Sequence, residues 1–173
     1  MESRNKIQDA LLALMKQYPY KDITITQICQ EAGIVRQTYY RNFDSKDDIL
    51  EFYLDAMIQQ YWDDYYNSQN VHAQVENFFE YMLIHKEFLC FVSKNDLFFM
   101  INKTITANLN KFLNMEQLTT IKKTRFEKYI KGYIASTICS LLSLWVENQF
   151  LESPKTISKL AQRFFIGLSS KKE

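Results

Sequence analysis

The sequence predicts an all-α protein, and three observations support that prediction. Only three of its 173 residues are Gly and two are Pro, whereas all-β folds use both residues freely at turns. Its composition, 47% hydrophobic and 24% charged, is that of a folded chain with a substantial core. Apolar residues follow the spacing of an amphipathic helix across residues 5–18 and again across residues 49–61. Long helices joined by short links are the expected architecture.

The first two helices have recognisable ends. The apolar stripe of the first consists of Ile7, Ala10, Leu11, Leu14, Met15 and Tyr18. Pro19 should end this helix, because the residue before a proline is disfavoured in the helical conformation. Thr24 and Gln27 form the capping pattern that starts a second, short helix. Gly33 suits the left-handed position that follows its end.

A brief polar segment and several longer helices follow. Across residues 36–42 we expect only Tyr39 to point inward, together with the following Phe43, so the rest of this segment faces outward. Ser45 is the expected N-cap of a long helix that continues to about Tyr66. Further helices are predicted at residues 71–85, 87–112, 122–150 and 154–168, with residues 94–96 as a candidate break. Ser153 is the expected cap of the last helix, with Pro154 in its first turn.

Charge and cysteine content limit the class of protein. Residues 1–50 carry seven basic and seven acidic side chains, so a DNA-binding prediction must rest on local residues and not on net charge. Cys29, Cys90 and Cys139 are widely spaced without a CxxC pair, which favours reduced thiols over disulfides or a zinc site. No signal peptide is expected, and the uncharged stretch 132–146 is too short to span a bilayer. We expect a soluble cytoplasmic protein without a membrane partner.

The order of elements in the first 50 residues is typical of a helix-turn-helix, in which a glycine-containing turn joins two short helices and another helix supports them. Arg36, Gln37 and Thr38 begin the outward-facing second helix of the pair. Their guanidinium, amide and hydroxyl groups are able to read guanine, adenine and thymine edges in the major groove. Hydroxyl and cationic groups at the rim would meet phosphate oxygens. The residues expected at this rim are Tyr40, Arg41 and Lys46.

A more specific resemblance follows from the same stretch. Residues 23–43, ITITQICQEAGIVRQTYYRNF, followed by SKDDIL at residues 45–50, resemble the DNA-binding head of the TetR/AcrR-type repressors. The resemblance implies a helix-turn-helix domain over residues 1–48 and a larger helical ligand-binding and dimerisation domain over residues 49–173. The predicted DNA-contacting residues are Thr26, Arg36, Gln37, Thr38, Tyr40, Arg41, Asn42 and Lys46.

Two positions depart from the family pattern. Val35 lies where the family usually has a Ser or Thr that caps the recognition helix. Loss of such a cap costs about 1 kcal/mol. Asn42 replaces a frequent His or Tyr at a phosphate-facing position.

The resemblance also implies a ligand cavity between the helices of the body. The aromatic and Met side chains that would line it are Trp62, Phe78, Tyr81, Met82, Phe98, Phe99 and Trp145. The same residues equally suit a plain hydrophobic core, because aromatic stripes at helical spacing are typical of packed helices.

A dimer interface is expected on the last two long helices, which in the family form a four-helix interface between two subunits. A stripe of small side chains on the first of them would let a partner helix approach closely. The predicted interface residues are Gly132, Ser136, Ser140 and Ser143 of this stripe, with Phe164 and Phe165 of the last helix.

These features predict a homodimeric transcriptional regulator that binds a palindromic double-stranded DNA operator and is released from it by a small-molecule effector. Repression is the family's usual outcome. Two alternatives stay open: an activator or partner-dependent regulator of the same fold, and a helical dimerisation module that has lost DNA binding. An enzyme is disfavoured, because no nucleophile–base pair, metal cluster or glycine loop stands out. We therefore expect no catalytic residue, metal or cofactor, and interpret His72 and Glu76 as a solvated helix face.

Overall fold

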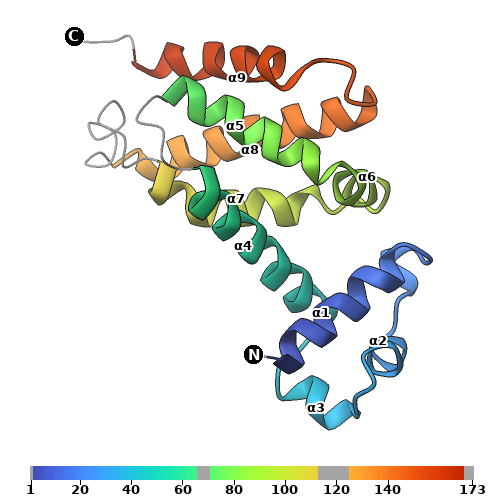
Figure 1. The fold of residues 1–173 in the computed structure, drawn as a ribbon. Helices are drawn as coiled ribbons and strands as arrows, with labels where there is room; N and C mark the ends of the chain where they lie inside the picture. Colours follow the sequence, from blue (N-terminus) through green and yellow to red (C-terminus); the bar gives the residue numbers. More distant parts are fainter. Residues whose placement is uncertain (1, 66–70, 113–124, 170–173) are drawn as a thin grey trace. The chain divides into compact units, whose positions relative to one another are not determined.

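The computed structural model describes residues 2–65, 71–112 and 125–169, and these ranges contain helices and connecting turns without any strand. The predicted all-α fold class is confirmed there. The elements are α1 (Glu2–Met15), the 3₁₀ turn η1 (Tyr20–Asp22), α2 (Ile25–Glu31), α3 (Arg36–Tyr40), α4 (Lys46–Tyr65), α5 (Val71–Ile84), α6 (Lys86–Lys94), α7 (Phe98–Phe112), α8 (Glu127–Glu147) and α9 (Pro154–Ser169) (Figure 1).

The chain forms two compact units, which we call the head (residues 1–57) and the body (residues 58–173). The division falls inside α4, so this helix contributes its first turns to the head and its last turns to the body. The domain boundary predicted after residue 48 divides the chain by function, and it stays a prediction.

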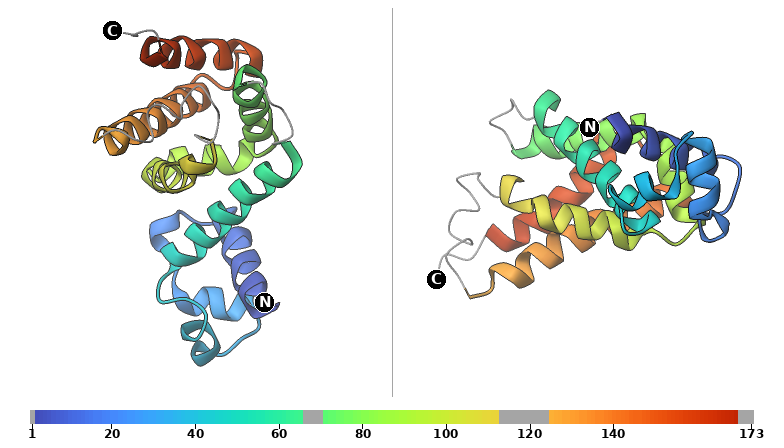
Figure 2. Two further views of the ribbon diagram at one scale, coloured as in Figure 1. Left: turned by 90° about the vertical axis from the view of Figure 1, so that its left-hand side faces the viewer. Right: turned by 90° about the horizontal axis from the view of Figure 1, so that it is seen from below.

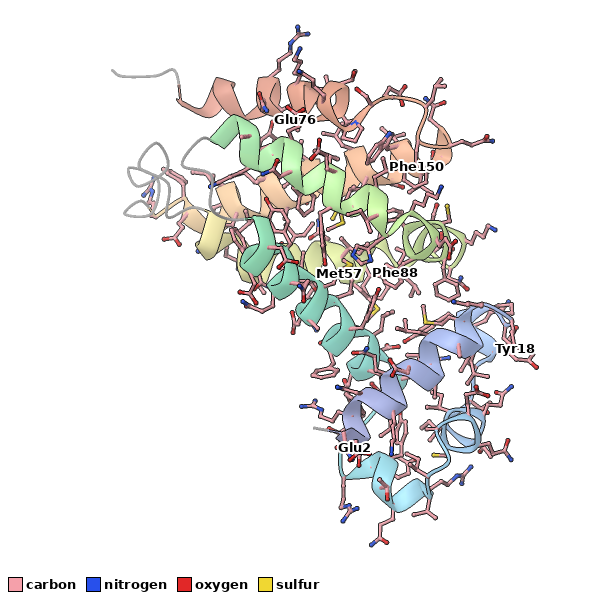
Figure 3. The ribbon with its side chains drawn as sticks, in the orientation of Figure 1. Glu2, Tyr18, Met57, Glu76, Phe88 and Phe150 are labelled. Atoms are coloured by element: carbon pink, nitrogen blue, oxygen red, sulfur yellow. The ribbon has the colours of Figure 1, made fainter. Side chains whose placement is uncertain are left out.

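Helix α1 differs from its prediction at both ends. It begins at Glu2 and ends at Met15, whereas the apolar pattern predicted a helix that reaches Tyr18. The backbone N–H of Tyr18 still donates to the carbonyl of Leu14 at 2.9 Å, but in a turn that leads into Pro19. Tyr18 is consequently exposed, and its assignment to the buried stripe is wrong (Figure 3). The other five stripe residues are buried.

Helix α2 has the ends that the sequence predicts. The Thr24 hydroxyl accepts from the backbone N–H of Gln27 at 3.3 Å, and the Gln27 side chain accepts from the backbone N–H of Thr24 at 2.8 Å. This reciprocal pair satisfies two amides that the first helical turn cannot pair internally. At the other end Gly33 has φ +64°, which is a left-handed conformation that suits glycine. The turn therefore fixes where α3 begins.

The core of the head comes from all four of its helices. Helix α2 packs on α1 and α3 packs on α2. Ile7, Ile28, Tyr39, Ile49 and Leu50 are each fully buried. Because these residues come from four helices, the short helix α3 is held by tertiary packing and not by its own five residues.

In the body, α5 lies along α9 and α7 lies along α8, with α6 against α8 (Figures 1 and 2). The break predicted at residues 94–96 separates α6 from α7. Asp96 there has φ 57°, and the backbone N–H of Leu97 donates to the carbonyl of Val92 at 3.0 Å. The predicted cap of α9 is also present, since the Ser153 hydroxyl accepts from the backbone N–H of Thr156 at 3.2 Å.

Helix α8 is the longest apolar helix among the described residues. By length and composition alone it is capable of crossing a membrane. Eight of its side chains between Ile134 and Val146 are nevertheless buried against the other body helices. This burial is typical of a core helix.

Candidate nucleic-acid interface

Helix α3 is short and begins without a side-chain cap. Val35 occupies the N-cap position with φ −85° and ψ 153°, and its aliphatic side chain accepts no hydrogen bond from the first turn of α3. The predicted loss of the cap is confirmed. Val35 itself is 67% exposed. The stability of α3 must therefore come from the side chains that it buries.

Tyr39 is the buried anchor of α3. Its side chain is fully buried, and Phe43 just beyond the helix is buried as well, as predicted. No described residue forms a hydrogen bond with the Tyr39 hydroxyl. Burial raises the pKa of this phenol far above its ordinary value. Tyr39 therefore packs inside the head, as the sequence predicts.

The opposite side of α3 faces solvent. Arg36, Gln37, Tyr40 and Arg41 are exposed. The Tyr40 ring lies edge-on to the ring of Tyr39, with centroids 5.3 Å apart. This contact fixes the direction of Tyr40 while 54% of the residue stays exposed.

Thr38 and Asn42 are only half-buried, and both belong to the predicted DNA set. The Asn42 side-chain amide donates to the backbone carbonyl of Thr38 at 2.7 Å. One amide proton of Asn42 is thereby used to cap the C-terminal end of α3. Asn42 keeps a second amide proton and its carbonyl oxygen for other partners.

Arg36 is tied to the preceding helix. Its Nη2 atom donates to the Thr26 hydroxyl on α2, and the two atoms are 2.5 Å apart. Arg36 also faces Cys29 of α2: burial raises the pKa of that thiol, and the positive charge of Arg36 partly opposes the rise. The structure thus brings two predicted DNA residues together across the turn.

Lys46 has a role that the sequence did not predict. Its ammonium donates to the backbone carbonyls of Tyr20 at 2.5 Å, Ile23 at 3.0 Å and Lys21 at 3.2 Å. It also lies 4.6 Å from the centroid of the Tyr20 ring. Burial lowers the pKa of Lys46. Since an ammonium has three protons, a contact with phosphate requires Lys46 to leave these carbonyls.

The start of α4 is fixed by further bonds around Lys46. The Tyr20 hydroxyl donates to Asp47 at 2.7 Å. Ser45 caps the helix as predicted, because its hydroxyl accepts from the backbone N–H of Asp48 at 3.2 Å. The Asp48 carboxylate in turn accepts from the backbone N–H of Ser45 at 2.9 Å. Acidic residues in this first turn also suit the helix dipole.

Sequence reasoning missed one more residue of the head. The guanidinium of Arg4 lies over the rings of Phe43 and Phe52, 4.8 and 4.5 Å from their centroids. The two rings are themselves in edge-to-face contact. Arg4 thereby links α1 to Phe43, which lies between α3 and α4, and to Phe52 of α4. Local sequence patterns do not predict this cation–π contact, because its partners lie far apart in the chain.

The head matches a known family of DNA-binding proteins. A family model described as bacterial regulatory proteins, tetR family, matches residues 7–52. Residues 7–52 thus carry the pattern of a TetR-type DNA-binding domain. The matched residues run from α1 into the first turns of α4 and include every predicted DNA-contacting residue.

Three solved structures share the fold of this chain over both units. The dihydroxyacetone kinase operon activator DhaS is 19% identical, with a TM-score of 0.61 and 96% of each chain covered. The fatty acid degradation regulator FadR from Bacillus halodurans is 17% identical, with a TM-score of 0.62 and 95% of each chain covered. A structure described as a TetR-family transcriptional regulator from Syntrophomonas wolfei is 16% identical, with a TM-score of 0.61; 99% of this chain and 97% of that chain are covered. No curated protein sequence matches the chain significantly.

The residues predicted to line a ligand cavity in the body lie in different environments. Trp62, Phe78, Tyr81, Met82 and Trp145 are buried, Phe98 is half-buried and Phe99 is 62% exposed. Aromatic rings form a chain of edge-to-face contacts through this core, from Tyr61 to Phe78, Phe79, Trp145 and Phe150. This arrangement is equally typical of a packed core, and the ligand cavity stays a prediction.

The predicted dimer residues on α8 share its outer face. Ser136 and Ser140 are exposed, while Gly132 and Ser143 are half-buried. A Cβ atom added at Gly132 would meet no described atom within 4 Å. On α9, Phe164 is 45% exposed, whereas the side chain of Phe165 lies outside the described residues. Two side chains of this stripe form hydrogen bonds within the subunit: the Ser136 hydroxyl accepts from Asn102 at 3.2 Å, and the Ser143 hydroxyl donates to Glu147 at 3.2 Å.

Large apolar side chains flank this stripe. Tyr129 is 74% exposed, Tyr133 45% and Leu144 59%. Between α8 and α9 the surface has a groove of about 860 Å³, with Leu141, Leu144, Trp145, Ile157 and Leu160 among its lining residues. The outer side of α8 and α9 thus combines small residues, exposed rings and a groove with both apolar and charged lining residues.

Proposed function

We propose that this chain is a homodimeric, sequence-specific regulator of transcription that reads double-stranded operator DNA with α3. The observation that carries the proposal is the two-sided character of α3. Its inner side is anchored by Tyr39, while Arg36, Gln37, Tyr40 and Arg41 are exposed. A recognition helix requires this combination, because its side chains must reach base edges while its backbone stays fixed.

The exposed side chains divide into two chemical roles. Gln37 carries an amide that is able to donate to and accept from adenine. Arg36 carries a guanidinium that is able to donate two hydrogen bonds to guanine O6 and N7. Tyr40 and Arg41 offer a hydroxyl and a cation, which suit phosphate oxygens and carry no direct sequence information. We therefore assign base reading to the first turn of α3 and orientation on the duplex to its end.

The outer side of α8 and α9 supports the proposed homodimer. A two-fold axis would bring the small residues Ser136 and Ser140 of one subunit against those of the other, with the exposed rings covered around them. Exposed apolar patches on a soluble chain often mark such interfaces. In a dimer the two copies of α3 would enter half-sites one helical turn, or a multiple of it, apart.

We further propose that the regulator is a cytoplasmic repressor that a small ligand releases from its operator, and that it is not an enzyme. The ligand would bind in the body and favour a spacing of the two heads that does not fit DNA. The ligand must bind one spacing of the heads more tightly than the other. A ligand that binds both spacings equally does not change the equilibrium between them. One of the structures of similar fold is described as an operon activator, so activation is the second candidate. A reporter gene placed behind the operator distinguishes the two, because deleting the regulator raises expression only for a repressor.

Selection of bound duplexes from a random pool tests DNA reading. The wild-type chain should enrich a palindromic sequence, and Gln37→Ala should change the preferred base at one position of each half-site. Gln17→Ala makes the same change at an exposed residue beyond the end of α1 and should leave the preference unaltered. Enrichment of no sequence by the wild-type chain would contradict the proposal and favour a dimerisation module without DNA binding.

The dimer is tested by sedimentation of the full chain. Ser140→Arg places a long cation in the small-residue stripe and should convert the dimer to a monomer. Ala107→Arg makes a comparable change at an exposed small residue of α7 and should leave the dimer intact. A dimer that tolerates Ser140→Arg, or a monomeric wild-type chain, would contradict this part of the proposal.

A further inference from the structure

The bond between Arg36 and Thr26 joins the two helices of the helix-turn-helix on their exposed side. Nη2 of Arg36, the first residue of α3, lies 2.5 Å from Oγ1 of Thr26, the second residue of α2. Both side chains are exposed. The hydroxyl of Thr26 is the acceptor, because a guanidinium only donates.

This bond restricts the most flexible side chain of the predicted reading surface. A free Arg side chain samples many rotamers, and ordering it on DNA opposes binding. The guanidinium carries five N–H groups, and the bond to Thr26 uses one of them. Four remain, and a guanine edge with its O6 and N7 acceptors needs two. The bond is therefore compatible with base reading and fixes the guanidinium before DNA arrives.

The places of the two residues suit different parts of a duplex. In a helix-turn-helix the first helix crosses the DNA backbone, and the N-terminal residues of the second helix contact base edges. Thr26 lies on the first helix and Arg36 begins the second. The bond thus spans the boundary between backbone and groove, and it fixes the position of Arg36 relative to both.

We propose that Thr26 is a positioning residue for Arg36, whose guanidinium it holds in place to read a guanine in the major groove. The inference rests on the proposed DNA-binding function and adds a specificity determinant to it. Thr26 acts through its hydroxyl oxygen, so Ser is able to replace it and Val is not. Arg36 supplies the contact with the base.

Because the pair is exposed, its effect on DNA reading is separable from its effect on folding stability. A hydrogen bond between two exposed side chains contributes little to folding. Val has the shape of Thr and is β-branched as well, so Thr26→Val removes the acceptor and leaves the helix otherwise similar. The melting temperature of Thr26→Val should therefore equal that of the wild-type chain, and any effect on DNA reading is separate from stability.

The experiment measures the affinity of the full chain for its selected duplex and for every single-base-pair variant of one half-site. Thr26→Val should lower discrimination at one guanine position by about three- to tenfold, the effect of freeing one long side chain. Arg36→Ala should abolish discrimination at the same position. Thr26→Ser should restore the wild-type profile, and adding Thr26→Val to Arg36→Ala should produce no further loss.

Three results would overturn the inference. Unchanged discrimination in Thr26→Val would show that the bond does not position Arg36. Equal weakening for all sequences, with a lower salt dependence, would instead make Thr26 a phosphate contact. In both cases the wild-type chain still selects a sequence, so the proposed function survives. A wild-type chain that selects no sequence removes the function and the inference together.

Discussion

Replacing Lys46 by Met should destabilise the head by about 2 kcal/mol, a figure taken from the net value of hydrogen bonds in folded proteins. The substitution removes three hydrogen bonds from the ammonium to backbone carbonyls of residues 20–23. Met keeps the apolar stem, so the change tests the charged group and not the packing of the side chain.

The magnitude follows from the surroundings of the ammonium. Hydrogen bonds to a charged group contribute roughly 1.5–3 kcal/mol each when they are well buried. Lys46 is only half-buried, and burial lowers its pKa, so lost hydration opposes the gain from these bonds. Taking each bond at the neutral value of about 0.5–1 kcal/mol gives roughly 2 kcal/mol. The contact with the Tyr20 ring adds about 0.5 kcal/mol, the lower end of the range for such contacts.

The assay must report on the head. Trp62 and Trp145 both lie in the body, so tryptophan fluorescence does not follow the head directly. Hydrogen exchange of peptides from residues 16–34 during urea titration measures the opening of this segment. The matched control is Lys21→Met, an exposed lysine of the same turn, which should change stability by less than about 0.5 kcal/mol. A Lys46→Met variant as stable as this control would refute the reasoning.

The same variant separates the two roles of Lys46. If Lys46 leaves its carbonyls to meet phosphate, Lys46→Met reduces the slope of log affinity against log salt by about 0.9, the value for one phosphate contact. If its role is confined to the turn, the slope is unchanged and only stability falls. The salt dependence of DNA binding therefore tests the predicted phosphate contact of Lys46.

Three further substitutions test local features of the fold by urea unfolding. Val35→Thr supplies the missing cap of α3 and should stabilise the head by about 0.5–1 kcal/mol; no gain would show that the first turn is satisfied in another way. Tyr39→Phe removes a buried hydroxyl for which the described residues provide no hydrogen-bond partner. The free energy of unfolding should therefore stay equal or rise by up to about 1 kcal/mol. A fall of more than about 1 kcal/mol would show that the hydroxyl has a partner. Gln149→Gly relieves a left-handed residue with φ 54° and should stabilise the body by about 0.5–1 kcal/mol; destabilisation would contradict the claim of backbone strain.

Much of the head was predictable because its signals are local. The Thr24–Gln27 cap, the left-handed Gly33 and the cap at Ser45 each involve residues within three or four positions of one another. Inward Tyr39 followed from helical spacing. These features determine where helices begin and end, and the family match covers the same stretch.

The contacts that refine the DNA surface were not predictable in this way. Lys46 reaches carbonyls more than twenty residues away, and Arg36 reaches Thr26 across a turn. The sequence does not distinguish a lysine or arginine that contacts a carbonyl or hydroxyl of its own chain from one that contacts a phosphate. Tyr18 fitted the periodic pattern and is exposed, because α1 ends before it.

The body illustrates a different limit of sequence patterns. Buried Trp62 and exposed Phe99 belong to the same aromatic pattern, and periodicity does not distinguish them. The small residues of α8 share one face as predicted, but a dimer interface is a property of two chains. Identifying the residues that contact a ligand or a second subunit thus requires information about those molecules, which the sequence of one chain does not provide.

Chemical footprinting of the selected duplex tests most directly that α3 enters the major groove. Dimethyl sulfate methylates guanine N7 in the major groove and adenine N3 in the minor groove. The account predicts that the full chain protects guanine N7 atoms in two clusters one helical turn, or a multiple of it, apart, with adenine N3 left reactive between them. Protection confined to adenine N3, or a bound duplex whose guanines all stay reactive, would contradict it.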